Sequence, residues 1–188
     1  MQENEKQQKR RVAKELMERG VNRQLHHKRL ADYFGDKHTL TSCFYSAECL
    51  TNLVNGYDVV NLYSSSNMLN EAGRVVLRGL LLNGLDARSY TWLDLLCIHY
   101  GNPTDEVIDK YQACEIVYIE NAYDGFFGFP SSLGDPYKLQ LLIDGVLKDN
   151  KLLFTTSSDK ISEWKWFSPR FLALLESTAY EVPYVGRH

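Results

Sequence analysis

The sequence predicts an α/β protein, in which one parallel five-stranded sheet is covered by helices on both faces and preceded by a helical extension. Strand-like and helix-like segments alternate five times at short spacing, which is typical of parallel sheets with helical crossovers. The 188 residues are 44% hydrophobic and 24% charged, as in an ordinary globular domain. No apolar run reaches the roughly 18 residues of a membrane span, so we expect a cytoplasmic protein without membrane contact.

The predicted extension covers residues 1–56. Within it, residues 3–19 form a predicted helix whose only apolar members are Val12, Leu16 and Met17. A helix with so little apolar surface is expected to pack weakly on the body and to stay exposed until it meets a partner.

Charge is distributed unevenly along the chain. Residues 1–30 carry nine Lys or Arg and four Glu, a net charge of +5, whereas the rest of the chain carries −8. A basic arm on an acidic body suits nucleic acid or an acidic partner. The alternative is a solvated amphipathic helix whose charges have no special role.

The remaining elements belong to a predicted domain of residues 57–188. Runs rich in β-branched and aromatic residues predict strands, at 58–63, 87–92, 114–119, 151–156 and 179–182. Helical segments fall between them, at 70–82, 93–100, 104–111, from 136 onward, 160–165 and 169–177, after an earlier one at 46–55. Asn83-Gly84 ends one of these helices, and Asp135-Pro136 opens another, because Asp can accept free N–H groups and Pro suits the first helical position.

Polar residues follow three of the predicted strands. They are Ser64–Asn67, Glu120–Asn121 and Thr156–Ser158. Ligands of open parallel sheets bind beyond the carboxyl ends of the strands. The sequence therefore predicts that the functional site lies at these three ends.

The order and spacing of these segments resemble the DnaC-type replicative-helicase loaders and their IstB-type relatives, which are AAA+ ATPases. The likeness spans roughly residues 12–188. Residues 59–63 resemble the strand before the Walker A loop, 116–120 resemble Walker B, and 152–158 resemble the sensor 1 strand. The lead-in at 15–33 and the stretch at 168–176 are also similar to the family. The resemblance implies a P-loop, AAA+-like sheet.

The phosphate loop departs from the family pattern. Ser64 and Leu69 stand where the first and last Gly belong, Asn70 stands in place of the Lys, and Glu71 in place of the Ser or Thr. A phosphate would meet a carboxylate instead of an ammonium group, which costs several kcal/mol at about 4 Å for a surface-like dielectric.

The other positions of the predicted nucleotide site are also altered. Arg74 is either a substitute cation over the loop or an exposed helix residue. Glu120 keeps one Walker B acid, but Asn121 replaces the catalytic Glu and cannot take a proton from water. Ser158 occupies the sensor position, and Arg170 is either an arginine-finger candidate or a surface arginine. The full set of this degenerate site is Ser64, Ser65, Asn67, Asn70, Glu71, Arg74, Glu120, Asn121, Ser158 and Arg170.

The resemblance implies an accessory protein of DNA replication, in a bacterial cell or an infected host. We expect it to bind a DnaB-type hexameric helicase without hydrolysing ATP, with no catalytic residue, cofactor or metal. Single-stranded DNA is a weak second partner, and self-association stays open. Two alternatives remain, an active ATPase with a deviant phosphate loop and an IstB-type accessory of transposition. The predicted partner-binding residues are Arg10, Arg11, Lys14, Leu16, Met17, Phe126 and Phe127.

The loop at 123–130 carries three phenylalanines between glycines. Such a patch is typical of an interface, and bases could also stack on it. The alternative is a lid packed over the nucleotide cleft.

Overall fold

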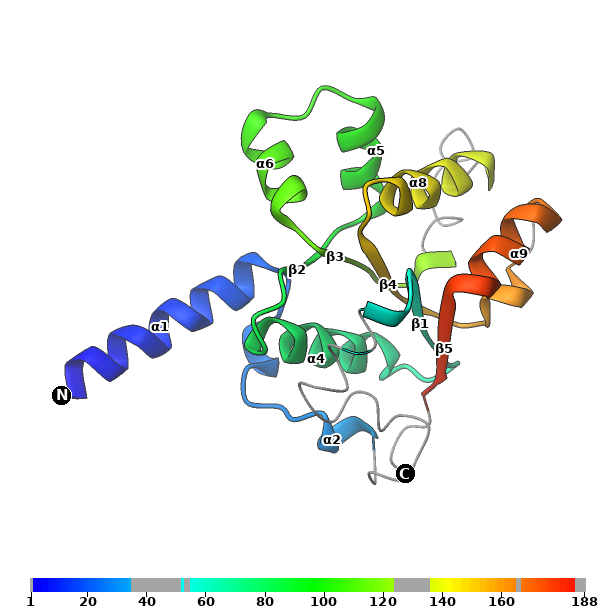
Figure 1. The fold of residues 1–188 in the computed structure, drawn as a ribbon. Coiled ribbons are helices and arrows are strands. Elements are labelled where there is room, and N and C mark those ends of the chain that lie inside the picture. The colour runs from blue at the N-terminus through cyan, green and yellow to red at the C-terminus, as the bar shows by residue number, and fades with distance from the viewer. Residues whose placement is uncertain (1, 35–51, 53–54, 124–135, 165–166, 185–188) are drawn as a thin grey trace.

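The computed structural model describes residues 2–34, 52, 55–123, 136–164 and 167–184 (Figure 1). Its centre is one sheet of five parallel strands in the order β2-β3-β4-β1-β5. The strands are β1 (Val59–Tyr63), β2 (Ala87–Ser89), β3 (Ile116–Ile119), β4 (Leu152–Ser157) and β5 (Ala179–Pro183). The predicted parallel five-stranded sheet is therefore confirmed.

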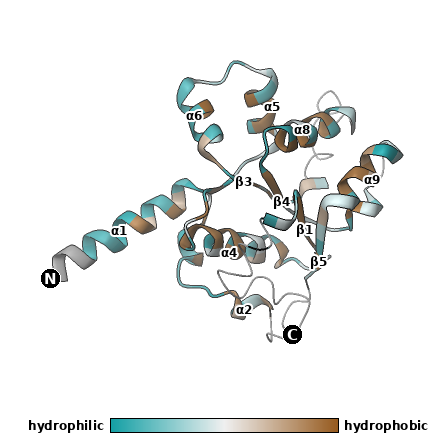
Figure 2. Cartoon of the chain, viewed as in Figure 1, coloured by the Kyte–Doolittle hydropathy of each residue, from teal (hydrophilic) through white to brown (hydrophobic). Residues whose placement is uncertain are grey.

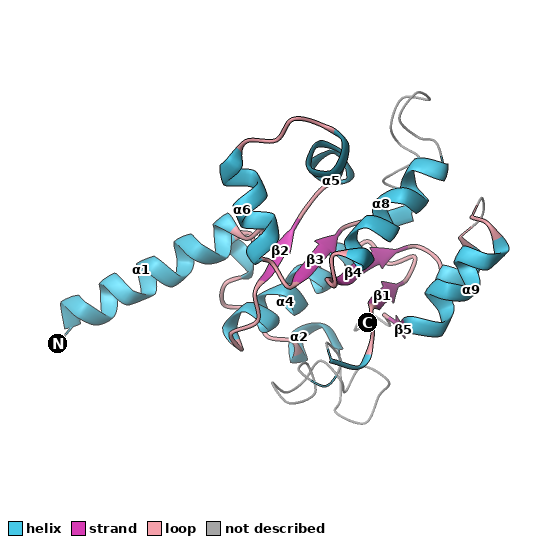
Figure 3. Cartoon of the chain, turned by 45° about the horizontal axis from the view of Figure 1, so that its top comes forward, coloured by secondary structure: helices cyan, strands magenta, loops and turns pink. Residues whose placement is uncertain are grey.

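The described helices connect or precede these strands. They are α1 (Gln2–Glu18), α2 (Ala31–Phe34), α4 (Leu69–Leu82), α5 (Trp92–Tyr100), α6 (Asp105–Ala113), α8 (Pro136–Lys148) and α9 (Pro169–Thr178), with short 3₁₀ turns η1 (Arg23–Leu25) and η3 (Ile161–Glu163). Figure 3 shows these helices around the sheet.

The sheet is buried on both faces, and alternate residues of each strand serve different cores. Val60 and Leu62 face a core built with α4, α2 and the end of α1. Val59 faces a second core built with α5, α6, α8 and α9. A strand buried on both sides requires continuous apolar runs, and β3 satisfies this with four fully buried residues. Helices thus cover both faces, as the alternation of segments predicted.

The N-terminal helix α1 projects from the body, but its last turn is anchored. Leu16 is 5% exposed and belongs to the α4-side core, and Arg19 forms an ion pair with Asp86. The prediction that this helix packs only weakly is wrong at its C-terminal end, because Leu16 reaches into the same core as the sheet. Most of α1 is nonetheless hydrophilic and exposed (Figure 2).

Two predicted boundaries shift for local reasons. The second strand ends at Ser89 instead of residue 92, because Thr91 caps α5 in a reciprocal capping box with Asp94. The helix expected at 160–165 is only a short 3₁₀ turn, η3. Most of the predicted helix at 46–55 lies outside the described residues. Within the described part of the chain, no helix is long and apolar enough to span a membrane.

Candidate functional site

Three strand ends meet at the carboxyl edge of the sheet, because β4 lies between β1 and β3. The turn after β1 leads directly into α4, whose N-terminus lies at this edge. The polar residues that follow the three strands are thereby brought together, as the sequence predicted. The contacts among them define what the site can do.

The turn from Ser64 to Met68 uses its own groups to satisfy its backbone N–H groups. The amide of Ser66 donates to Ser64 Oγ at 3.1 Å, and that of Met68 donates to Ser66 Oγ at 3.2 Å. The Leu69 amide donates to the carbonyl of Ser66 at 3.1 Å. Serine hydroxyls commonly bind nearby amides in this way. These three amides are thus already hydrogen-bonded within the turn.

An acidic side chain occupies the first turn of α4. Glu71 accepts a hydrogen bond from the hydroxyl of Tyr33 on α2, and a carboxylate is favoured at a helix N-terminus by the helix dipole. Burial, followed by the Glu71 carboxylate, raises the pKa of Tyr33 well above its usual range. An anion placed here would have to displace or repel Glu71.

The second charged contact joins α4 to the end of β3. Arg74 binds Glu120 through two nitrogens, Nε to Oε1 and Nη2 to Oε2, the latter at 2.8 Å. The hydrogen bond from Glu120 is the main cause that raises the pKa of Arg74. Bidentate pairs of this kind are strong and directional. Arg74 is therefore paired with Glu120, and its side chain remains 37% exposed.

Asn70 is held by the sheet. Thr156 Oγ1 donates to Asn70 Oδ1 at 2.8 Å and accepts from the Asn121 amide at 3.0 Å. The fully buried Tyr118 donates weakly to Asn70 O and to Glu120, at 3.5 and 3.4 Å. Asn121 has φ +47°, a left-handed conformation that Asn tolerates better than most residues.

A buried polar network, which was not predicted from the sequence, lies on the opposite face of the sheet from α4. Asn61 Oδ1 accepts hydrogen bonds from Thr155 Oγ1 and Ser157 Oγ, both at 2.9 Å. Its amide donates to Asp159 O and to Glu181 Oε1, both at 3.3 Å. Asn61 is 0% exposed, and a buried amide needs partners. A lone Asn inside an apolar strand was the available signal for this network.

The remaining predicted site residues are partly or largely exposed. Ser158 bonds Asp159 at 2.9 Å, and Ser65, Asn67 and Arg170 are exposed. Arg170 sits on α9, which packs on the opposite face of the sheet from α4.

The predicted partner-binding residues divide into three groups. Arg10, Arg11 and Lys14 are exposed on α1, and so is Met17, at 55%. Leu16 is buried, which removes it as an accessible anchor. Phe126 and Phe127 lie outside the described residues.

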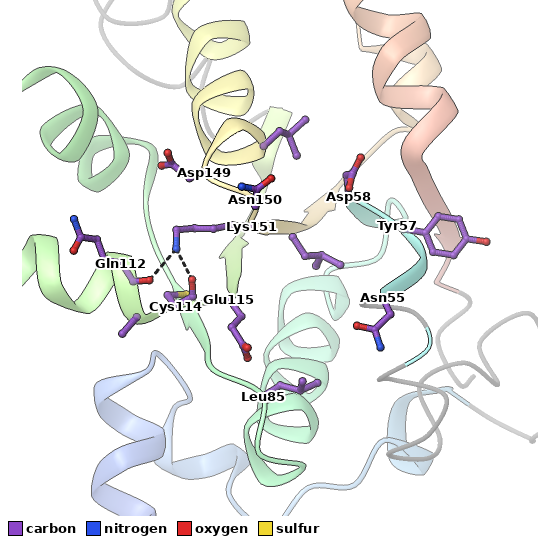
Figure 4. Close-up of a pocket in the computed structure, with 13 residues that line it drawn as sticks. Asn55, Tyr57, Asp58, Leu85, Gln112, Cys114, Glu115, Asp149, Asn150 and Lys151 are labelled. Carbon is purple, nitrogen blue, oxygen red and sulfur yellow. Dashed lines mark hydrogen bonds between the residues drawn. The ribbon is translucent and has the colours of Figure 1, made fainter.

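A polar cavity of about 620 Å³ lies at the opposite, amino-terminal edge of the sheet (Figure 4). Its Lys151 donates to the carbonyls of Cys114 and Gln112, at 2.5 and 3.3 Å, and its ammonium lies over the Tyr111 ring. Lys151 therefore satisfies carbonyls at the end of α6, which is a structural role. Among the described residues, no three His, Cys, Asp or Glu side chains are placed to hold a metal.

Comparison with solved structures identifies the fold. A replication initiator DnaA bound to AMPPCP and single-stranded DNA matches with a TM-score of 0.60 and 13% identity, covering 88% of this chain and 51% of that one. DnaI matches with a TM-score of 0.55 and 14% identity, covering 89% and 93%. A protein described as a primosome component of Streptococcus pyogenes matches with a TM-score of 0.52 and 13% identity, covering 89% and 91%.

The chain shares its fold, one parallel five-stranded sheet with helices on both faces, with the DnaA and DnaI structures. The chain spans about half the length of the DnaA structure but nearly all of DnaI. No protein-family model matches the sequence, and no curated protein is significantly similar to it. The strand ends described above lie at the carboxyl edge of the sheet, where open parallel sheets bind their ligands.

Proposed function

We propose that this protein is an accessory factor of DNA replication that binds a replicative hexameric helicase stoichiometrically, without ATP hydrolysis. The AAA+ fold shared with DnaI and DnaA supports the link to replication. The proposal that the protein does not hydrolyse ATP rests on two side-chain contacts in the N-terminal half of α4. Glu71 is held by Tyr33, and Arg74 by Glu120.

These contacts oppose nucleotide binding for electrostatic reasons. A triphosphate at the start of α4 would approach Glu71, where the family pattern has a hydroxyl that holds Mg²⁺. Arg74 would have to leave Glu120 before it could meet a phosphate, and breaking a charge-assisted pair costs about 1.5–3 kcal/mol. Asn121, at the place of the catalytic acid, cannot act as a general base.

Titration of the protein with Mg-ATP tests the nucleotide half of the proposal. We expect binding weaker than about 1 mM, equivalent to about −4 kcal/mol, and no phosphate release above a buffer control. Micromolar affinity that is lost in Arg74→Met would favour the active ATPase with a deviant phosphate loop.

Size-exclusion chromatography with the replicative helicase of the same host tests the partner half. We expect the intact chain to co-elute with the helicase in the absence of nucleotide. Arg11→Glu, on the exposed face of α1, should weaken capture, whereas Arg170→Glu on α9 makes the same charge change at a distance and should not. If the intact chain fails to co-elute, the helicase proposal is wrong, and a DNA-binding accessory of the IstB type becomes the better reading.

A further inference from the structure

A groove of about 380 Å³ runs between α1 and the C-terminal half of α4. Val12, Ala13 and Leu16 line its α1 side, and Arg78 and Leu82 line its α4 side. Val12 is 38% exposed and Leu82 is 51% exposed, so apolar surface on both helices faces solvent. Figure 1 shows that α1 leaves the body next to the end of α4 and continues outward.

The charged side chains that line the groove are all basic. Lys9 and Arg78 line it, and among the described residues that form its walls there is no Asp or Glu. Arg78 donates to the carbonyl of Lys28 at 3.0 Å, but its buried Nε has no hydrogen-bond partner. Burial lowers the pKa of Arg78, and no described carboxylate forms an ion pair with it.

Arg78 is a partly desolvated cation beside the apolar surface of Val12 and Leu82, and a carboxylate is the group that would complement it. The Arg78 side chain is only partly buried, so a carboxylate that enters the groove can form a charge-assisted hydrogen bond with its guanidinium group. Amphipathic helices fill such grooves with apolar anchors spaced by three or four residues. An acidic residue on the flank of that helix would complement Arg78 and Lys9.

We propose that the groove between α1 and α4 docks an acidic amphipathic helix of the partner protein. The anchors of that helix pack between Val12 and Leu82, and one of its carboxylates binds the Arg78 guanidinium. The inference rests on the proposed function only in taking the replicative helicase as the source of the helix. It makes α4 part of the binding surface, in addition to α1.

The groove is tested first with synthetic peptides and the full-length chain. The probe is a fluorescent helical peptide of about 15 residues, with leucines at the i, i+3, i+4 and i+7 positions and glutamates on the flanks. Its twin carries lysines in place of the glutamates. We expect the glutamate peptide to bind at least about tenfold more tightly, since the charges meet Arg78 and Lys9 in one case and repel them in the other.

Variants of α4 localise the binding. Leu82→Ser and Arg78→Met should each weaken the glutamate peptide by about fivefold or more, because interface energy is concentrated in a few anchors. Leu93→Ser, on the exposed surface of α5, is the matched control and should bind like the wild type. Thermal melts confirm that each variant is folded. Equal affinity for the two peptides, or binding indifferent to Leu82→Ser and Arg78→Met, would overturn the groove proposal.

The helicase experiment separates this inference from the proposed function. If wild type captures the helicase and Leu82→Ser does not, both stand. If Leu82→Ser and Arg78→Met capture it as well as wild type does, the groove proposal fails and the proposed function survives. If no variant captures helicase but the glutamate peptide binds selectively, the groove stands without its proposed source. Self-association that disappears in Leu82→Ser would instead assign the groove to a second copy of this chain and overturn the proposal.

Discussion

Gly73 is the residue at which α4 comes closest to the sheet. A Cβ atom at this position would lie 2.6 Å from Thr156 Cγ2 and would also overlap the hydroxyl of Tyr118. Both neighbours are buried, so neither can move away easily. The contacts of Asn70 and Arg74 with the strand ends therefore depend on the missing side chain at Gly73.

We predict that Gly73→Ala destabilises the protein by about 1–3 kcal/mol, the usual cost of overpacking a close contact. Denaturant unfolding followed by circular dichroism measures the loss. Tyr118→Phe in the same chain should recover part of it, because the overlap with the hydroxyl disappears while that with Thr156 remains. A Gly73→Ala protein as stable as the wild type would show that α4 can shift away from the sheet.

His99 gives the protein a local dependence on pH. Burial lowers the pKa of His99, and its ring lies against Tyr111, whose hydroxyl donates to Asp149 at 2.9 Å. With a folded pKa below the unfolded value of about 6.5, the unfolded chain binds the extra proton between the two values. Stability therefore falls as pH drops below about 6.5 and the loss is complete below the folded pKa.

We predict that the melting temperature falls between about pH 7 and pH 5, and that His99→Gln loses less over the same range, because glutamine does not titrate. Melting curves at several pH values provide the measurement, with His27→Gln, an exposed histidine, as the control. An identical pH dependence in His99→Gln and the wild type would contradict this account.

At the scale of elements, α1 has two parts with different roles. Residues 6–11 are exposed, whereas Leu16 is buried and Arg19 pairs with Asp86. A backbone hydrogen bond also attaches the segment after α1 to β2, since the Ser89 amide donates to the carbonyl of Arg19 at 3.0 Å. The helix is therefore an exposed arm with a fixed base.

Two truncations should separate these parts. We predict that deleting residues 1–11 leaves the melting temperature nearly unchanged, whereas deleting residues 1–20 lowers it, because the longer deletion removes Leu16 and Arg19. The matched point variants are Leu16→Ser, expected to cost about 2–4 kcal/mol as a buried leucine, and Met17→Ser, expected to cost almost nothing. Calorimetric melts of the four proteins decide the matter. Equal stability of the two truncated chains would mean that the base of α1 is not an anchor.

The elements differ in how far local sequence determines them. The strands could be predicted because β1, β3 and β4 contain short apolar runs between helical segments. In an α/β protein, such runs indicate strands that are buried on both faces of a parallel sheet. The meeting of their polar ends followed from topology. The role of Leu16 could not be predicted from α1, since one apolar residue in a polar helix does not reveal what lies opposite it.

Side-chain contacts between residues far apart in the sequence could not be predicted either. Tyr33 is 38 residues from Glu71, and Arg74 is 46 residues from Glu120. No local sequence pattern predicts such contacts, because each of these side chains could equally well lie on the surface. The sequence indicates only that Arg74 lies on a helix, whereas its partner Glu120 comes from the end of β3.

At the scale of the whole molecule, charge is separated between the arm and the body. Residues 1–30 carry +5 and the remainder −8, and α1, which holds five of the nine basic residues of that segment, extends away from the sheet (Figure 1). A polyanion would be attracted to the arm and repelled by the body. Any contact with single-stranded DNA should then be weak and strongly salt-dependent.

We predict that binding to an unstructured oligonucleotide weakens as salt increases, and that the triple change of Arg10, Arg11 and Lys14 to Ala flattens this dependence. Each lost phosphate contact removes about 0.7 from the slope of log affinity against log salt for single strands. Fluorescence anisotropy at several salt concentrations measures it. Tight binding that survives the triple change would assign DNA to another surface, such as the loop containing Phe126 and Phe127.

The contacts around α4 also limit which amino-acid substitutions evolution could use to alter this site. Replacing Asn70 by lysine alone would place the new ammonium beside Glu71 and remove the acceptor of Thr156. Replacing Glu71 alone would release Tyr33 while leaving Arg74 bound to Glu120. Neither single step improves the fit to a triphosphate, and each loses an existing hydrogen bond. If the proposed function is correct, a gain of nucleotide binding would need several substitutions at once, and selection acting on one mutation at a time offers no easy path to it.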